Sequence, residues 1–162
     1  MRVKLLDRGF VFAIPQIRGT RHFDFDWYAQ GIADNKIKHF TDFMDVSYFL
    51  TDNGVTNRLI LYGDEYSGSI TATVAMIQNP EIYSLQILNN PAFDVFDLCM
   101  NSNKNIDLIE EFGDITNRQF YEIMKLYSPY HSKLPETHSP LLVTTDENNK
   151  NKIQAMKFIA KL

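Results

Sequence analysis

The feature that most constrains the fold is a strand, a sharp turn and a helix that follow one another directly in the first half of the chain. Leu59-Ile60-Leu61-Tyr62 is a short apolar run typical of a buried strand, and residues 69–78 form a mainly apolar helical stretch that ends at Asn79-Pro80. Gly63 and Gly68 flank the connection, where a residue without a side chain tolerates a strained backbone. The segment therefore predicts one strand–helix unit of an α/β sheet.

Strands and helices alternate along the rest of the chain. The other predicted elements are strands at residues 10–15, 83–88 and 141–145, helices at 39–50, 106–112, 117–127 and 152–162, and a long loop at 16–34. The first of these strands is a continuous apolar run closed by Pro15, which predicts burial on both faces. Alternation of this kind implies a mostly parallel sheet flanked by helices, with ligands bound at the carboxyl ends of the strands.

Bulk composition predicts one domain and excludes several classes of protein. The chain has 162 residues, of which 44% are hydrophobic and 13% aromatic, so disorder throughout is excluded. Its net charge of −4 does not provide the basic face that nucleic-acid binding needs, so we expect no nucleic-acid partner. A single cysteine, Cys99, forms no internal disulfide, which favours a cytoplasmic location.

Neither a membrane span nor a metal site is predicted. The chain has no run of about 18 apolar residues, and no apolar stretch follows the basic N-terminal residues as in a signal peptide. His131 and His138 lack a carboxylate or cysteine at metal-ligand spacing. We therefore expect no membrane partner, no metal and no other cofactor.

The turn after the first-described strand is where hydrolases of the α/β class carry Gly-x-Ser-x-Gly, with the serine on the strained bend. In this chain Glu65 stands two residues after Gly63, and Tyr66 stands two residues before Gly68. Ser67 fits neither count. The motif predicts hydrolase geometry with a displaced hydroxyl, and it leaves a working hydrolase, an inactive one and another function on the same scaffold open.

A series of short motifs, in order along nearly the whole chain, resembles the catalytic domain of the prolyl oligopeptidase family, and its oligopeptidase B branch most of all. The motifs are Asp7-Arg8-Gly9-Phe10, Ile17-Arg18-Gly19, Trp27-Tyr28 with Gly31, Asn79-Pro80-Glu81, Pro91 with Asp94-Val95, Glu110-Glu111-Phe112-Gly113, Tyr127-Ser128-Pro129-Tyr130, Leu141–Thr145 and Ala160-Lys161-Leu162. The resemblance implies a serine peptidase, and in the oligopeptidase B branch one that cleaves short peptides after Arg or Lys.

The same resemblance implies a partial α/β-hydrolase fold. Residues 1–162 correspond to an internal piece of the family's catalytic domain, without its first strands, its C-terminal segment or the β-propeller that filters substrates. We therefore expect a truncated catalytic domain. A missing edge leaves backbone groups unpaired, so we also expect self-association, or a complementing chain, through an exposed sheet edge.

Carried over residue by residue, the family pattern is incomplete in this chain. The family serine falls near Glu65, Tyr66 and Ser67, the family aspartate near Asn149 and Asp146, the acidic and aromatic substrate contacts near Glu110, Glu111 and Phe93, and the structural positions on Arg18, Gly19, Gly63 and Gly68. In this fold the catalytic histidine follows the aspartate, yet none of the four histidines lies after the last predicted strand. A serine nucleophile without this base is not activated.

The incomplete pattern leads to three competing expectations. The first is a catalytically inactive peptidase domain. The second is a fragment that is active only in trans with a partner chain that supplies the histidine. The third is a non-catalytic module that binds a short peptide or a small anion in the crevice at residues 63–69, where a helix N-terminus offers backbone N–H groups that favour an anion. We expect the first.

Overall fold

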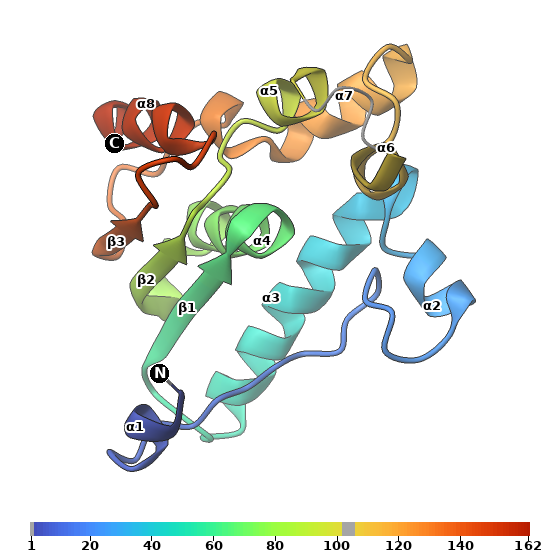
Figure 1. Ribbon diagram of the computed structural model, residues 1–162. Helices are drawn as coiled ribbons and strands as arrows, with labels where there is room; N and C mark the ends of the chain where they lie inside the picture. The colour runs from blue at the N-terminus through green and yellow to red at the C-terminus, as the bar shows by residue number, and fades with distance from the viewer. Residues whose placement is uncertain (1, 102–105) are drawn as a thin grey trace.

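The computed structural model describes residues 2–101 and 106–162. The strands in these residues form one parallel sheet in the order β1-β2-β3, where β1 is Leu59–Asp64, β2 is Tyr83–Asn89 and β3 is Leu141–Thr144 (Figure 1). Because the strands are parallel, their carboxyl ends meet at one edge of the sheet. The predicted α/β class with a parallel sheet is confirmed.

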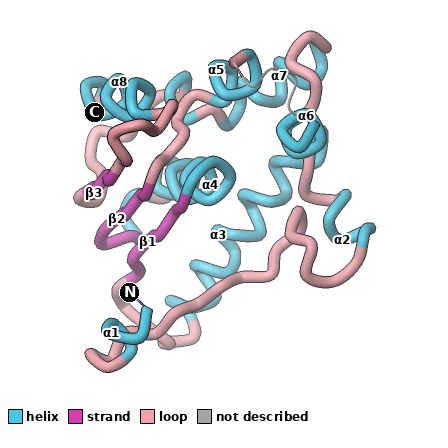
Figure 2. Tube along the Cα trace, viewed as in Figure 1, coloured by secondary structure: helices cyan, strands magenta, loops and turns pink. Residues whose placement is uncertain are grey.

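Helices connect and cover the strands (Figure 2). They are α1 (Arg2–Leu6), α2 (Phe25–Ala29), α3 (Lys36–Asp52), α4 (Glu65–Gln78), α5 (Val95–Met100), α6 (Ile106–Phe112), α7 (Arg118–Tyr127) and α8 (Lys152–Lys161), with short 3-10 turns at Ala33–Asn35, Pro80–Ile82 and Pro129–His131. None of the helices in the described part of the chain is long and apolar enough to cross a bilayer.

The central helix α4 packs on β1 and β2, and α3 packs on α4. Residues 69–76 of α4 are all buried, which explains the nearly continuous apolar and small-residue run in this helix. Leu61 and Leu88 of the sheet join Met76 in one core cluster. The strand residues that alternate with them face the other way, and this second face is less covered: Ile60, Tyr62 and Leu142 are exposed.

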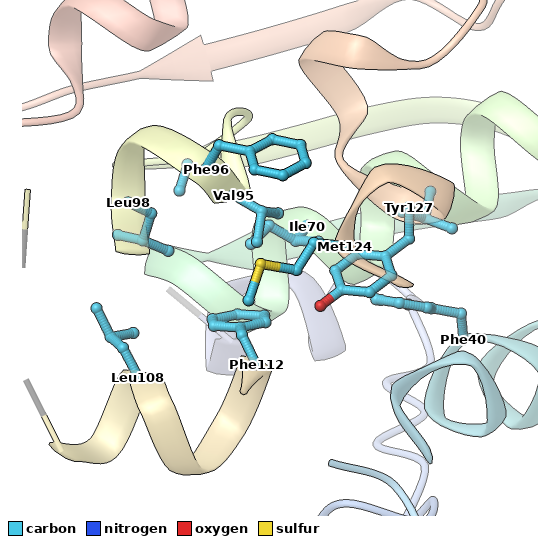
Figure 3. Close-up of a cluster of buried hydrophobic side chains, with 11 residues drawn as sticks. Phe40, Ile70, Val95, Phe96, Leu98, Leu108, Phe112, Met124 and Tyr127 are labelled. Carbon is cyan, nitrogen blue, oxygen red and sulfur yellow. The ribbon is translucent and has the colours of Figure 1, made fainter. Parts of the chain in front are cut away.

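A second core cluster lies beyond the end of the sheet and joins α3 to α7 (Figure 3). Its aromatic members are Phe40, Phe96, Phe112 and Tyr127, and Met124 lies among them with no exposed surface. This packing brings α6 against the 3-10 turn that leads into α3, and so it places Glu111 of α6 beside Lys36 and beside Ser67 in the first turn of α4.

Two sequence predictions about the N-terminal part are wrong. Residues 10–15 form no strand, and the apolar side chains predicted to be buried are exposed, Val11 by 81%. The physical reason is that a strand needs a neighbour to pair with, and no described strand lies against this segment. The predicted loop at 16–34 contains the short helix α2, which Asp24 caps by accepting a hydrogen bond from Trp27 N.

Other elements also differ from the prediction in extent or existence: α3 begins at Lys36 rather than at residue 39, and α1 was not predicted. Helix α4 begins at Glu65 rather than at residue 69, because β1 continues to Asp64 and the chain enters the helix directly after it. Helix α5 was not predicted. Its signal was Asp94, whose carboxylate accepts hydrogen bonds from the backbone N–H groups of Phe96 and Asp97 and so caps the helix.

Candidate functional site

The turn between β1 and α4 has the sharp geometry that the sequence predicts. Glu65, the first residue of α4, has φ +52, in the left-handed region that side chains rarely adopt. A Cβ atom on Gly63 would lie 2.6 Å from Gly68 O and 2.8 Å from Ser69 Cα. Glycine at position 63 therefore allows the helix to begin against the strand, and the strained apex residue is Glu65.

The three candidate positions for the family serine point in different directions. Glu65 and Tyr66 are exposed at the start of α4. Ser67 is half-buried, and its hydroxyl donates a hydrogen bond to Glu111 Oε1 at 3.0 Å. The nearby Ser69 is fully buried, where its Oγ accepts from Ala92 N at 3.0 Å. The hydroxyls of this turn thus serve as partners inside the fold.

Ser67 belongs to a buried polar cluster formed by Lys36, Ser67 and Glu111, which we call the lysine cluster. The ammonium of Lys36 is fully buried, pairs with Glu111 Oε1 and lies 3.5 Å from Ser67 Oγ. It also lies 5.7 Å from the ring centroid of Phe40 and 5.4 Å from that of Phe112. Burial lowers the pKa of Lys36, and the Glu111 carboxylate opposes that shift.

His39 lies next to the lysine cluster, but both of its ring nitrogens are engaged. Nδ1 donates to Arg18 O at 2.8 Å, and Nε2 lies 3.0 Å from Thr71 Oγ1. Burial, assisted by the charge on Lys36, lowers the pKa of His39 to about 4, so the ring is neutral at pH 7. The ring has no hydrogen bond to a residue of the turn that carries Glu65, so it does not act as a base there.

Arg18 and Gly19 hold the loop that precedes α2. The Arg18 guanidinium and backbone N–H both bond to Asp42, with Nε 2.7 Å from Oδ2. Gly19 has φ +90, and a Cβ there would lie 2.7 Å from Gly31 O and 2.8 Å from His39 Nδ1. Arg18 and Gly19 are therefore structural in this arrangement: they lock the loop onto α3.

The carboxyl ends of the strands are joined by polar side chains. Asn89 Nδ2 donates to Asp64 Oδ1 at 2.9 Å, and Asn90 Nδ2 donates to Asp146 Oδ2 at 2.9 Å. Asn149 Oδ1 accepts from Asn151 N at 2.7 Å and so orders the loop before α8. The two positions predicted for the family aspartate thus hold loop structure, and neither bonds to a histidine in the described residues.

The other histidines also lie away from Glu65. His131 Nδ1 lies 3.1 Å from the buried Ser128 Oγ and 3.7 Å from Asp94 Oδ1, so both contacts fall on the same ring nitrogen. A catalytic triad needs the two partners on opposite nitrogens, so this group is not one. His22 and His138 are exposed in loops. In residues 2–101 and 106–162 no group of His, Cys, Asp or Glu side chains is arranged to hold a metal ion.

The predicted substrate contacts separate into a core residue and two surface carboxylates. Phe93 is fully buried and stacks on Phe158 with ring centroids 4.0 Å apart, so it lies in the core and not in a pocket. Glu110 is half-buried and lines a cavity of about 580 Å³, whereas Glu111 lines a second cavity of about 500 Å³. Arg21 and Tyr28 line both cavities.

Sequence reasoning missed the lysine cluster and Arg21. Ser67 is separated by 31 residues from Lys36 and by 44 from Glu111, so no local pattern joins them. The one signal was the sequence position of Lys36, a lysine at the start of an amphipathic helix that becomes fully buried. Arg21 lay in a segment predicted as loop, and its partner Glu110 is 89 residues away.

Comparison with known proteins identifies the scaffold. A sequence model described as the prolyl oligopeptidase family matches residues 1–162. The chain is 29% identical to dipeptidyl aminopeptidase BI of Pseudoxanthomonas mexicana over 99% of its own length and 23% of that protein's. It is 28% identical to protease 2 of Moraxella lacunata over 99% of its own length and 24% of that protein's. The chain thus spans about a quarter of the length of these curated relatives.

Solved structures agree with the sequence relatives. A structure from a study of two prolyl endopeptidases matches with a TM-score of 0.79 and 27% identity, over 89% of this chain and 22% of the other. Prolyl oligopeptidase B from Galerina marginata matches with a TM-score of 0.85 and 22% identity, over 95% of this chain and 22% of the other, a likeness of fold. The fold is that of prolyl oligopeptidase catalytic α/β-hydrolase domains, and the chain belongs to the prolyl oligopeptidase family of serine peptidases.

Proposed function

We propose that this chain does not cleave peptides by the serine mechanism of its family and instead binds short peptides that carry basic side chains. The observation that carries the proposal is the residue at the apex of the β1–α4 turn. That residue is Glu65, with its backbone in the left-handed region and its side chain exposed. The serine mechanism needs an alcohol at this point, whose proton passes to an imidazole.

The nearest hydroxyl does not replace the missing one. The Ser67 hydroxyl donates a hydrogen bond to Glu111, and Glu111 is already paired with the buried ammonium of Lys36. No histidine of the described residues bonds to Ser67, so these residues provide it with no activating imidazole. Loss of the triad removes about a million-fold in rate in a well-studied serine protease. We therefore place Ser67 in the structural framework of the site.

The acidic lining of the two cavities supports the binding half of the proposal. Asp107, Glu110 and Glu111, all on α6, line the cavities together with the ring of Tyr28. Carboxylates beside an aromatic ring favour guanidinium and ammonium groups through ion pairing and cation–π attraction. This is why peptides with Arg or Lys are the proposed ligands.

The proposal is tested by labelling and hydrolysis on the same preparation. The purified chain is treated with a fluorophosphonate probe and with an arginyl amide substrate, and protease 2 of Moraxella lacunata serves as the active control. We expect no labelling and no hydrolysis above buffer. Labelling of the wild-type chain that disappears in Ser67→Ala would overturn the inactive assignment, because it would show an activated hydroxyl at that position.

A specific observation favours a second proposal, association through the sheet edge. Strand β1 pairs with β2 on one side, and no described strand pairs with its other side. The apolar residues Phe10, Val11 and Ile14 are exposed in a segment that pairs with no described strand. An unpaired strand edge is a template for pairing, so we propose that a second copy or a complementing chain binds along β1.

A further inference from the structure

Arg21 makes an unusual set of contacts for an exposed side chain. Its guanidinium carbon lies 4.6 Å from the centroid of the Tyr28 ring. One nitrogen, Nη2, donates to Tyr28 Oη at 3.2 Å and to Glu110 Oε1 at 3.1 Å. The Arg21 side chain is nevertheless 71% exposed. Stacking, a hydrogen bond and an ion pair therefore hold a cation that remains in contact with solvent and is free to leave.

Arg21 lines two neighbouring acidic cavities. Both cavities, of about 580 and 500 Å³, are lined by Arg21 and Tyr28, so these two side chains form the partition between them. The cavities lie where the loop around α2 approaches α6, near the N-terminal end of α3 (Figure 1). Tyr28 is the buried half of the partition, whereas Arg21 is the exposed half.

The charged side chains around the partition favour a cationic ligand over an anionic one. Four carboxylates line the two cavities, those of Asp24, Asp107, Glu110 and Glu111. The buried ammonium of Lys36 neutralises the charge of Glu111, and the neutral ring of His39 adds no charge to the cavity lining. If Arg21 turned outward, an anion would meet an acidic wall, whereas a second cation would meet the ring and the carboxylate that Arg21 had left.

We propose that Arg21 occupies, as an internal substitute, the position in which the arginine side chain of a peptide binds. Arg21 and the peptide's guanidinium compete for Tyr28 and Glu110, and the displacement of Arg21 joins the two cavities into one. A planar guanidinium stacks on a ring and donates from several nitrogens at once, which an ammonium does not. The site therefore prefers arginine to lysine. This inference rests on the proposed binding of basic peptides.

The competition is tested with N-acetyl-L-arginine amide, whose only charge is its guanidinium, in a titration followed by nuclear magnetic resonance. The neutral N-acetyl-L-citrulline amide and N-acetyl-L-lysine amide are the comparison ligands. Arg21→Ala, and Arg21→Gln with its larger side chain, both remove the guanidinium from the internal position. The control Arg118→Ala removes the same charge from an exposed residue of α7. If Arg21 holds the site for about nine-tenths of the time, its removal lowers the Kd about tenfold.

The expected result is tighter binding of the arginine ligand to both Arg21 variants, no change for Arg118→Ala, no binding of citrulline, and loss of the gain in Arg21→Ala/Glu110→Gln. Equal Kd values for wild type and both Arg21 variants would overturn the inference while leaving the binding of basic ligands standing. Weaker binding to the Arg21 variants would also overturn it, since Arg21 would then be a contact. If no protein binds the arginine ligand at millimolar concentration, the proposed function fails as well.

Discussion

The two faces of the sheet contrast in how far they are covered, although apolar side chains lie on both faces. On one face Leu61 and Leu88 pack under α4, and Leu88 has no exposed surface. On the other face Ile60, Tyr62 and Leu142 are 41%, 49% and 51% exposed. The register places Tyr62 beside Ile87 and Ile87 beside Leu142, so these residues form an apolar row across the strands.

The contrast shows that the contribution of an apolar strand residue to stability depends on which face of the sheet its side chain lies on. Burial on the covered face contributes to stability, roughly in proportion to the area removed from water. Apolar side chains on the open face are positioned by the hydrogen bonds between the strands, but they lose little contact with water and so contribute little to stability. Substitutions on the two faces should therefore separate stability from association.

The largest effect is expected from a pair of leucines on opposite faces. Leu88→Ala leaves a cavity beneath α4 and should lower the free energy of unfolding by about 2–5 kcal/mol. Leu142→Ala, the same change on the open face, should cost under about 1 kcal/mol. Urea unfolding followed by circular dichroism measures both. Equal losses for the two variants would show that the open face is covered in solution.

His39 of α3 is also buried, and its contribution to the free energy of unfolding depends on pH. Its pKa in the folded state is about 4, below the ordinary 6.5, so the unfolded chain binds more protons between these values. The free energy of unfolding should therefore fall as the pH falls from about 6.5 to about 4, by up to about 3 kcal/mol.

Variants of two histidines separate this contribution from that of other groups. His39→Gln should flatten the decline in stability between pH 7 and pH 4, whereas His22→Gln, at an exposed ring, should leave it unchanged. Unfolding curves at a series of pH values measure the slope. A slope that is the same in His39→Gln and wild type would remove His39 as its source.

An intermediate effect is expected at the turn that joins the covered face to α4. Gly63→Ala places a methyl group 2.6 Å from Gly68 O and should cost about 1–3 kcal/mol. Gly68→Ala is the matched control, because its added carbon would meet nothing closer than 3.8 Å. Thermal unfolding compares the two, and a tolerated alanine at position 63 would contradict the close approach of strand and helix.

The smallest effect on stability is expected on the open face, where association is the informative measurement. The triple variant Ile60→Thr, Tyr62→Thr and Leu142→Thr should change the free energy of unfolding little, since these side chains are exposed. If this face or the adjacent edge of β1 binds a second copy, sedimentation velocity should show less self-association than in the wild type. An unchanged distribution of species would place any self-contact elsewhere.

The sequence predicted the elements whose signals are local. The turn at Gly63 and Gly68 and the strands of the sheet depend on residues a few positions apart, and the structure contains them. The segment at 10–15 has an equally strong apolar pattern, yet it forms no strand. Strand formation depends on a partner that the pattern of one segment does not encode.

Prediction of the candidate site was limited in the same way, because its contacts join residues that are far apart in the sequence. The displaced hydroxyl at Ser67 was visible in the motif, but the partner that holds it, Glu111, is 44 residues away. Phe93 looked like a pocket aromatic because it follows Pro91 closely, and only packing against Phe158 reveals it as core. The stacking of Arg21 on Tyr28 required the three-dimensional path of a segment without periodicity.

Glu65 has one more consequence. A residue with a side chain in the left-handed region costs about 1 kcal/mol relative to glycine, and this side chain is exposed and buries nothing in return. Folding alone would favour glycine at that point. The polypeptide thus tolerates a conformational penalty at the bend between β1 and α4 and holds an acidic side chain outward there.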